Sequence, residues 1–149
     1  MKLAQKIPLI LAPLILYALH AGPAPTIITP PNYKIDLSKL PALIAPPAQA
    51  SKATQDQEKK LLQEVLTAFN ALYSAINTFN QDSAGITPPK TTAPTNYNLA
   101  LLPNLAQVPA NLTPGQLRKI NTDIHNVHST FYALQAAIGA YNKNSLKTE

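Results

Sequence analysis

The second half of this chain repeats residues of the first half at a constant spacing of 62 positions. In the first copy the identical residues are Val65, Phe69, Ala71, Leu72, Ala75, Ile76, Asn80 and Ser83, and in the second they are Val127, Phe131, Ala133, Leu134, Ala137, Ile138, Asn142 and Ser145. A tandem repeat constrains the architecture strongly, because each copy is expected to fold as the same unit. The repeat therefore predicts two units, 23–83 and 84–149, which follow an N-terminal apolar segment at 1–22.

Each unit is predicted to begin with an extended, proline-rich half, at 23–50 and at 84–112. The chain has 15 prolines, and proline at high density breaks helices and is excluded from the centre of sheets. The same segments carry apolar residues, including the matched pairs Leu40-Pro41 and Leu102-Pro103. A polyproline-II-like path packed along a helix accommodates both features, because that conformation makes no internal hydrogen bonds.

Each unit is then predicted to form one long amphipathic helix, at 52–81 and at 114–143. Apolar residues in these ranges recur at alternating spacings of three and four, which is the a/d pattern of a heptad and gathers them on one helical face. This stripe is predicted to form the core and to mediate interactions. Its residues are Leu62, Val65, Phe69, Leu72, Ile76, Phe79, Ile120, Ile124, Val127, Phe131, Leu134, Ile138 and Tyr141.

Capping residues support these helix boundaries. Thr113-Pro114-Gly115-Gln116 combines a capping threonine, a proline at the first helical position and a glutamine at the third. The first helix is expected to begin near Ser51 or Thr54, where Thr54 and Gln57 have the spacing of a capping box. Gly85 is expected to end that helix in a left-handed conformation.

These elements predict a mainly α fold in which two long helices pack as a pair, flanked by extended segments. A helix of about 25 residues is ~38 Å long, whereas a connector of about 30 residues spans up to ~90 Å at polyproline-II rise. The segment 84–112 is therefore long enough to run back along the first helix, while an antiparallel hairpin needs only about 2–8 residues. We expect a parallel pair. An antiparallel pair remains open, because a long connector can also fold over one face.

The N-terminal segment 1–22 has the organisation of a secretory signal peptide. Lys2 and Lys6 precede an apolar run of 13 residues, and small residues follow at 18–22. The run is shorter than the ~20 residues that span a bilayer. The segment therefore predicts a secreted or cell-envelope protein. An uncleaved membrane anchor, which would be the chain's contact with a membrane, and a buried apolar N-terminus are the alternatives.

Charge and cysteine content argue against several classes of function. Without residues 1–22 the basic residues fall from 12 to 10 against 7 acids, so the net charge falls from +5 to +3. The remaining basic residues are scattered, whereas nucleic-acid binding needs a clustered basic face; we therefore expect no nucleic-acid partner. The chain has no cysteine, which excludes thiol catalysis and cysteine-ligated metals.

Three pairs or motifs are candidate sites. His125 and His128 lie one helical turn apart, but a metal needs a further ligand and the pair is predicted at the solvent edge of the helix, so no metal or cofactor is expected. Tyr33 and Tyr97 recur after matched asparagines and are expected to pack their rings on a helix. Asn111 begins the glycosylation motif Asn-Leu-Thr.

The sequence favours a non-enzymatic function. Its acids are scattered and it lacks a nucleophile elbow and a phosphate-binding loop, so catalysis is not expected. The leading prediction is an exported structural or interaction protein, whose helices bind a second copy in a homo-oligomer or filament, or another protein. The alternative is a small helical carrier of an apolar ligand such as a lipid. Its pocket lining is predicted to be Phe69, Leu72, Phe79, Phe131 and Leu134.

Overall fold

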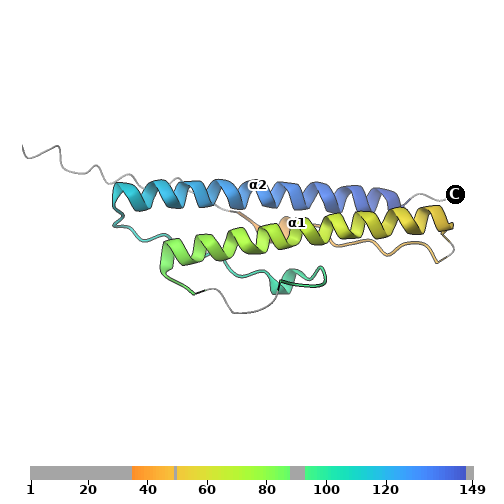
Figure 1. The fold of residues 1–149 in the computed structure, drawn as a ribbon, viewed down its shortest axis with the longest axis horizontal. Coiled ribbons are helices and arrows are strands. Elements are labelled where there is room, and N and C mark those ends of the chain that lie inside the picture. The colour runs from red at the N-terminus through yellow and green to blue at the C-terminus, as the bar shows by residue number, and fades with distance from the viewer. Residues whose placement is uncertain (1–34, 49, 88–92, 147–149) are drawn as a thin grey trace, which may run out of the picture.

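Two long helices make up most of the computed structural model, which describes residues 35–48, 50–87 and 93–146 (Figure 1). Helix α1 spans Lys52–Ala84 and helix α2 spans Pro114–Ser145. Short 3₁₀ turns precede them, η1 at Leu37–Lys39 and η2 at Leu99–Leu101. None of the described residues forms a strand. This part of the chain is therefore mainly helical, as the sequence predicts. The predicted signal peptide lies outside it.

Local hydrogen bonds determine where the helices begin and end. The predicted capping box of α2 is present: the Thr113 hydroxyl accepts the Gln116 N–H at 3.3 Å, and the Thr113 N–H donates to the Gln116 side chain at 3.0 Å. Helix α1 is capped by Ser51, whose hydroxyl accepts the Thr54 N–H at 3.3 Å. Thr54 therefore lies inside α1, and the capping box expected from Thr54 and Gln57 does not form its start. Gly85 ends α1 at φ 66°, a left-handed conformation that glycine adopts without steric cost. Both helices extend slightly past their predicted ends.

The two helices are antiparallel, so the parallel arrangement that we expected is wrong. In Figure 1 the yellow start of α1 lies beside the blue end of α2. At that end the Ser145 hydroxyl donates to the Glu58 carboxylate at 3.4 Å, and at the other end the Lys119 ammonium donates to Asp82 at 2.7 Å. This direction also places the positive end of each helix dipole beside the negative end of the other.

The path of the connector explains why its length did not reveal the helix direction. Beyond the end of α1, the chain returns to the middle of that helix, where the Tyr97 ring packs edge-on against Phe69 with 5.4 Å between ring centroids. It then runs forward again, so that Ala106 hydrogen-bonds Asn80 near the end of α1. The connector doubles back, and α2 consequently begins where α1 ends.

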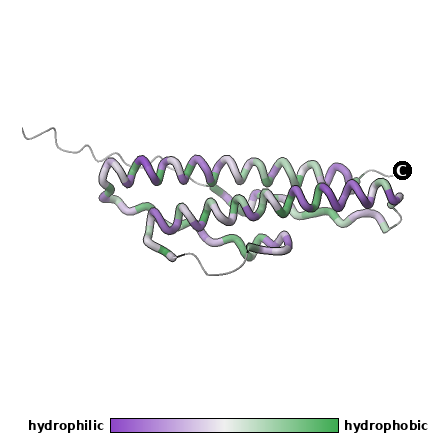
Figure 2. The backbone as a smooth tube through the Cα atoms, in the orientation of Figure 1, coloured by the Kyte–Doolittle hydropathy of each residue, from purple (hydrophilic) through white to green (hydrophobic). Residues whose placement is uncertain are grey.

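The core lies along the seam between the helices, in agreement with the alternation of green and purple along each helix in Figure 2. Its most completely buried side chains are Val65, Phe69, Leu72, Ile76, Phe79, Ile120, Val127, Leu134 and Ile138. Each large apolar side chain contributes about 1.5–3 kcal/mol when fully buried, which makes this seam the main stabilising feature. The extended segments add half-buried residues to it, among them Ile35, Leu37, Leu43, Tyr97, Leu99, Leu102 and Leu105.

Two asparagine side chains fasten the extended segments to the helices. The Asn80 amide donates to one carbonyl of the segment 104–106 and accepts one N–H from it, both at 2.8 Å. The Asn142 amide makes the same two bonds to the segment 42–44, both at 2.9 Å. Since an extended backbone has no internal partners for its polar groups, each asparagine takes the place of a neighbouring strand. These bonds position η1 on α2 and η2 on α1.

Candidate interaction surface

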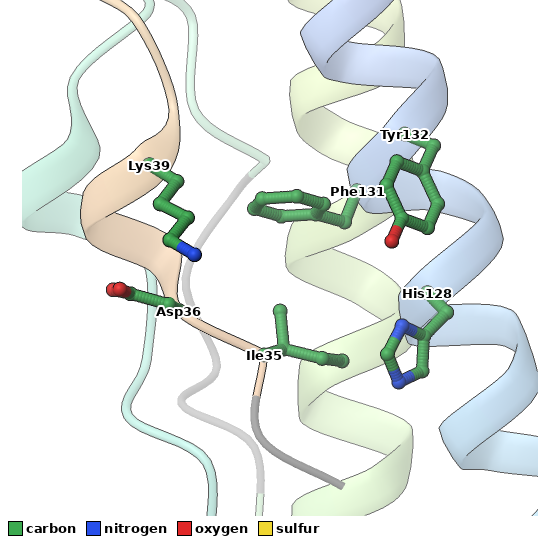
Figure 3. Close-up of a pocket in the computed structure, with 6 residues that line it drawn as sticks. All are labelled: Ile35, Asp36, Lys39, His128, Phe131 and Tyr132. Atoms are coloured by element: carbon green, nitrogen blue, oxygen red, sulfur yellow. The ribbon is translucent and has the colours of Figure 1, made fainter.

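A hollow of about 110 Å³ lies between η1 and α2 (Figure 3). Phe131 of α2 and Ile35 of the extended segment lie between the other four lining residues in Figure 3. In Figure 3, Asp36 and Lys39 lie on one side of these apolar residues, and His128 and Tyr132 lie on the other. Residues three and four positions apart on a helix share a face, so α2 brings its three lining residues to the same surface. The hollow is therefore apolar at its centre and polar at its rim.

Tyr132 is an exposed aromatic ring supported on two sides. Its side chain is 61% exposed. The ring stacks on His128, with 6.3 Å between centroids and 25° between planes, and meets the edge of Phe131 at 5.6 Å and 80°. These neighbours restrict the ring before any binding occurs, which lowers the entropy cost of fixing it in a complex.

Asp36 and Lys39 place opposite charges beside the hollow. Asp36 caps η1, where its carboxylate accepts the Ser38 hydroxyl at 2.5 Å and the Ser38 N–H at 3.1 Å. These two bonds hold the pKa of the Asp36 carboxyl below its usual value, and the bond from the Ser38 hydroxyl has the larger effect. The rim therefore carries a fixed negative charge one turn from a lysine.

A second polar cluster joins the two helices near the end of α1. Asp123 of α2 is only 6% exposed, and its Oδ2 atom has no hydrogen-bond partner. Burial, followed by the hydrogen bond and the charge of Asp82, raises the pKa of Asp123 to about 6, although the Lys119 ammonium acts in the opposite direction. The cluster belongs to the seam between the helices, and it bears on stability and its pH dependence.

The predicted stripe lies inside the monomer. Its buried residues are Val65, Phe69, Leu72, Ile76, Phe79, Ile120, Ile124, Val127, Phe131, Leu134, Ile138 and Tyr141. Leu62 is a correction, because it is 36% exposed whereas Leu61 is 9% exposed. At 100° per residue, Leu61 lies about 40° from Val65 and Leu62 about 60° away on the opposite side. Ile124 lies at the same angle from Val127 on α2 and is only 7% exposed, so the exposure of Leu62 depends on what packs beside it on α1 and not on the helical period alone.

The other predicted residues lie apart from one another. His125 is exposed and His128 is half-buried at the hollow, and the described residues contain no group of three or more potential metal ligands. Tyr97 packs on Phe69 and donates its hydroxyl to the Pro41 carbonyl at 2.9 Å. Burial raises the pKa of Tyr97. Asn111 is exposed just before α2, and Tyr33 lies outside the described residues.

The predictions from sequence did not include the exposed ring of Tyr132, the buried contact between Asp123 and Asp82, or the hydrogen bonds by which Asn80 and Asn142 hold the extended segments. Tyr132 adjoins a stripe residue, and a lone exposed aromatic carries no periodic signal. The two asparagines had a usable signal, because a polar residue that recurs 62 positions later beside an apolar stripe indicates a shared hydrogen-bonding role.

Comparison of the chain with protein-family models, with curated proteins and with solved structures gives no match. Within 35–48, 50–87 and 93–146, neither helix is apolar enough over a sufficient length to cross a membrane. The function must therefore be argued from the geometry of the surface.

Proposed function

We propose that this chain is an exported, non-enzymatic protein that self-assembles, or binds another protein, at the cell envelope or outside the cell. Export rests on the signal-peptide pattern at 1–22. Assembly rests on one observation: Tyr132 is 61% exposed, is held by His128 and Phe131, and borders a hollow. Supported aromatic rings beside a concavity are typical of the residues that dominate protein interfaces.

We also propose that the chain arose by duplication of a unit of 62 residues. Two facts support this proposal. The turns η1 and η2 begin 62 residues apart, and so do the helices α1 and α2. The two clamping asparagines, Asn80 and Asn142, have the same spacing, as do the segments that they bind. Each asparagine binds the extended segment of the other unit, so the units exchange segments and form one body.

In this proposal the heptad stripes build the core, and the outer surface mediates assembly. This differs from an assembly through the stripes, because their side chains already contact one another within one chain. The alternative of an apolar-ligand carrier has less support. Its predicted lining residues, such as Phe69, Phe79 and Leu134, are fully buried members of the same packed core.

Sedimentation velocity on the purified protein, over about a hundredfold range of concentration, tests the assembly. We expect the sedimentation coefficient of the wild type to rise with concentration, and that of Tyr132→Ser to stay at the monomer value. Leu101→Ser is the matched control, because Leu101 is 44% exposed on η2, away from the hollow; it should behave as the wild type. A wild type that remains monomeric at every concentration would refute self-assembly.

A further inference from the structure

The hollow corresponds to a position that an aromatic ring fills in the other half of the molecule. Adding 62 to Ile35 gives Tyr97, and subtracting 62 from Phe131 gives Phe69. Tyr97 and Phe69 form an edge-to-face pair with 5.4 Å between centroids and 71° between planes. On the hollow side the smaller Ile35 stands opposite Phe131, and about 110 Å³ is left over. The packing of Tyr97 on Phe69 therefore shows the kind of group, an aromatic ring, that fits the hollow beside Phe131.

The volume of the hollow agrees with a single ring. A closed apolar cavity of about 150 Å³ binds benzene, and this hollow of about 110 Å³ is partly open. Its apolar walls suit the face and edge of a ring, and its rim of Asp36, Lys39 and His128 suits a polar substituent. A phenol has both parts.

A suitable phenol stands at the edge of the same hollow. Among the described tyrosines, Tyr132 alone is exposed, whereas Tyr73 and Tyr97 are half-buried and Tyr141 is buried. A protrusion and a complementary recess that adjoin on one surface satisfy the geometry of a two-fold interface, in which each copy inserts its protrusion into the recess of the other.

The charges at the rim and the asymmetry between the two halves fit the same arrangement. Asp36 and Lys39 offer both signs of charge, so two copies related by a two-fold axis meet with opposite charges available on each side. Position 70, which corresponds to Tyr132 in the first half, holds a half-buried asparagine. The described surface therefore carries one such protrusion beside one such recess, which favours a closed dimer over a filament.

We propose that two copies of this chain form a two-fold dimer in which Tyr132 of each copy occupies the hollow beside Ile35 and Phe131 of the other. The proposal rests on the self-assembly proposed above and specifies its geometry. The inserted ring contacts Phe131 as Tyr97 contacts Phe69 in the other half.

Filling the recess from within tests the proposal. Ile35→Tyr places a ring where the other half carries Tyr97, so we expect the dimer dissociation constant to rise at least about tenfold while Tyr132 is untouched. Ile86→Tyr is the control: it adds a tyrosine at a residue that is 50% exposed and does not line the hollow, and it should dimerise as the wild type. Circular dichroism melting of each variant checks that it folds.

Mixing two defective variants separates insertion of a ring from general surface adhesion. Ile35→Tyr keeps its protrusion, and Tyr132→Ser keeps the Ile35 and Phe131 walls of its recess while losing the Tyr132 edge. An equimolar mixture should therefore form heterodimers more tightly than either variant forms homodimers. p-Cresol, the side-chain analogue of tyrosine, should compete with the unmodified protein and shift it towards monomer. The p-cresol competition uses only the unmodified protein, so it tests the proposal even if Ile35→Tyr does not fold.

The outcomes distinguish the two proposals. If the wild type dimerises and Ile35→Tyr dimerises equally well, ring insertion is overturned and self-assembly must use another surface. The same conclusion follows if the mixed variants form heterodimers no more tightly than homodimers. A wild type that is monomeric overturns both. A dimer that is unaffected by saturating p-cresol also counts against insertion.

Discussion

Replacing Asp123 by asparagine is expected to stabilise the protein at neutral pH. The carboxyl group is 6% exposed, one of its oxygens lacks a hydrogen-bond partner, and the carboxylate of Asp82 lies across the helix seam. A buried charge with an unpartnered atom costs free energy. Asparagine has nearly the same shape, carries no charge, and can donate its amide hydrogens towards Asp82.

The magnitude and its pH dependence follow from the raised pKa. The pKa of Asp123 is about 6 in the folded chain, against about 3.9 for an unfolded aspartate. Since the folded state binds the proton more tightly, this group contributes no penalty below pH ~4, and stability falls as pH rises from about 4 to about 6. The penalty above pH 6 is on the order of 2–3 kcal/mol. We expect Asp123→Asn to recover about 1–3 kcal/mol at pH 7 and little at pH 4.

Urea unfolding followed by circular dichroism at pH 4, 5, 6 and 7, read as the difference between variant and wild type, measures this effect. Asp56→Asn is the matched control, because Asp56 is exposed on α1 and pairs at 4.0 Å with the exposed Lys59; it should change the free energy of unfolding by less than about 0.5 kcal/mol. If Asp123→Asn destabilises the protein at pH 7, the buried charge of Asp123 is not unfavourable as argued. If the difference in free energy of unfolding between variant and wild type does not change with pH, Asp123 does not have a raised pKa.

Three further predictions concern the core and the extended segments. Asn80→Ala should lower the free energy of unfolding by about 2–4 kcal/mol and Asn142→Ala by about 1–2, since the same two bonds are lost but Asn80 is more deeply buried; equal losses measured by urea unfolding would contradict the role of burial. Tyr97→Phe keeps the ring on the core and removes one hydroxyl bond, so thermal unfolding should show a loss of about 0.5–1.5 kcal/mol, and no change would mean that water replaces the bond. Leu61→Ala should cost about 2–4 kcal/mol and Leu62→Ala under about 1, because only Leu61 lies in the core, and the reverse order would restore the strict heptad.

The sequence predicted the helices well because their signals are local. Thr113 and Gln116 form hydrogen bonds at the start of their own helix, and Gly85 ends α1 through its own backbone conformation. Most of the apolar stripe could likewise be predicted, because side chains at helical spacing share one face of a helix wherever that helix lies in the fold. Leu62 was the exception. It is exposed although Ile124, at the corresponding position of α2, is buried, so spacing alone does not determine which leucine at the edge of the stripe faces the seam.

The helix direction and the hollow were beyond the sequence for a different reason. The length of a connector bounds its reach and does not fix its path. Here Tyr97 packs on Phe69 in the middle of α1, and Asn80 binds the connector again near the end of that helix. The hollow depends on a comparison between Ile35 and Tyr97 that becomes visible only once both extended segments are placed on their helices. Long-range packing, and not local propensity, determines both features.

The antiparallel pairing of α1 and α2 underlies the asparagine hydrogen bonds, the hollow and the proposed dimer, and distances between spin labels test it most directly. The chain has no cysteine, so pairs of labelled cysteines can be introduced at the exposed positions Asp56, Arg118 and Lys143 without background, with unlabelled protein added in excess to suppress signals between copies. Antiparallel helices predict a short distance for the pair 56/143, which lies at the same end as the Glu58–Ser145 contact, and about 40 Å for the pair 56/118. A long distance for 56/143 together with a short one for 56/118 would establish parallel helices and contradict the account.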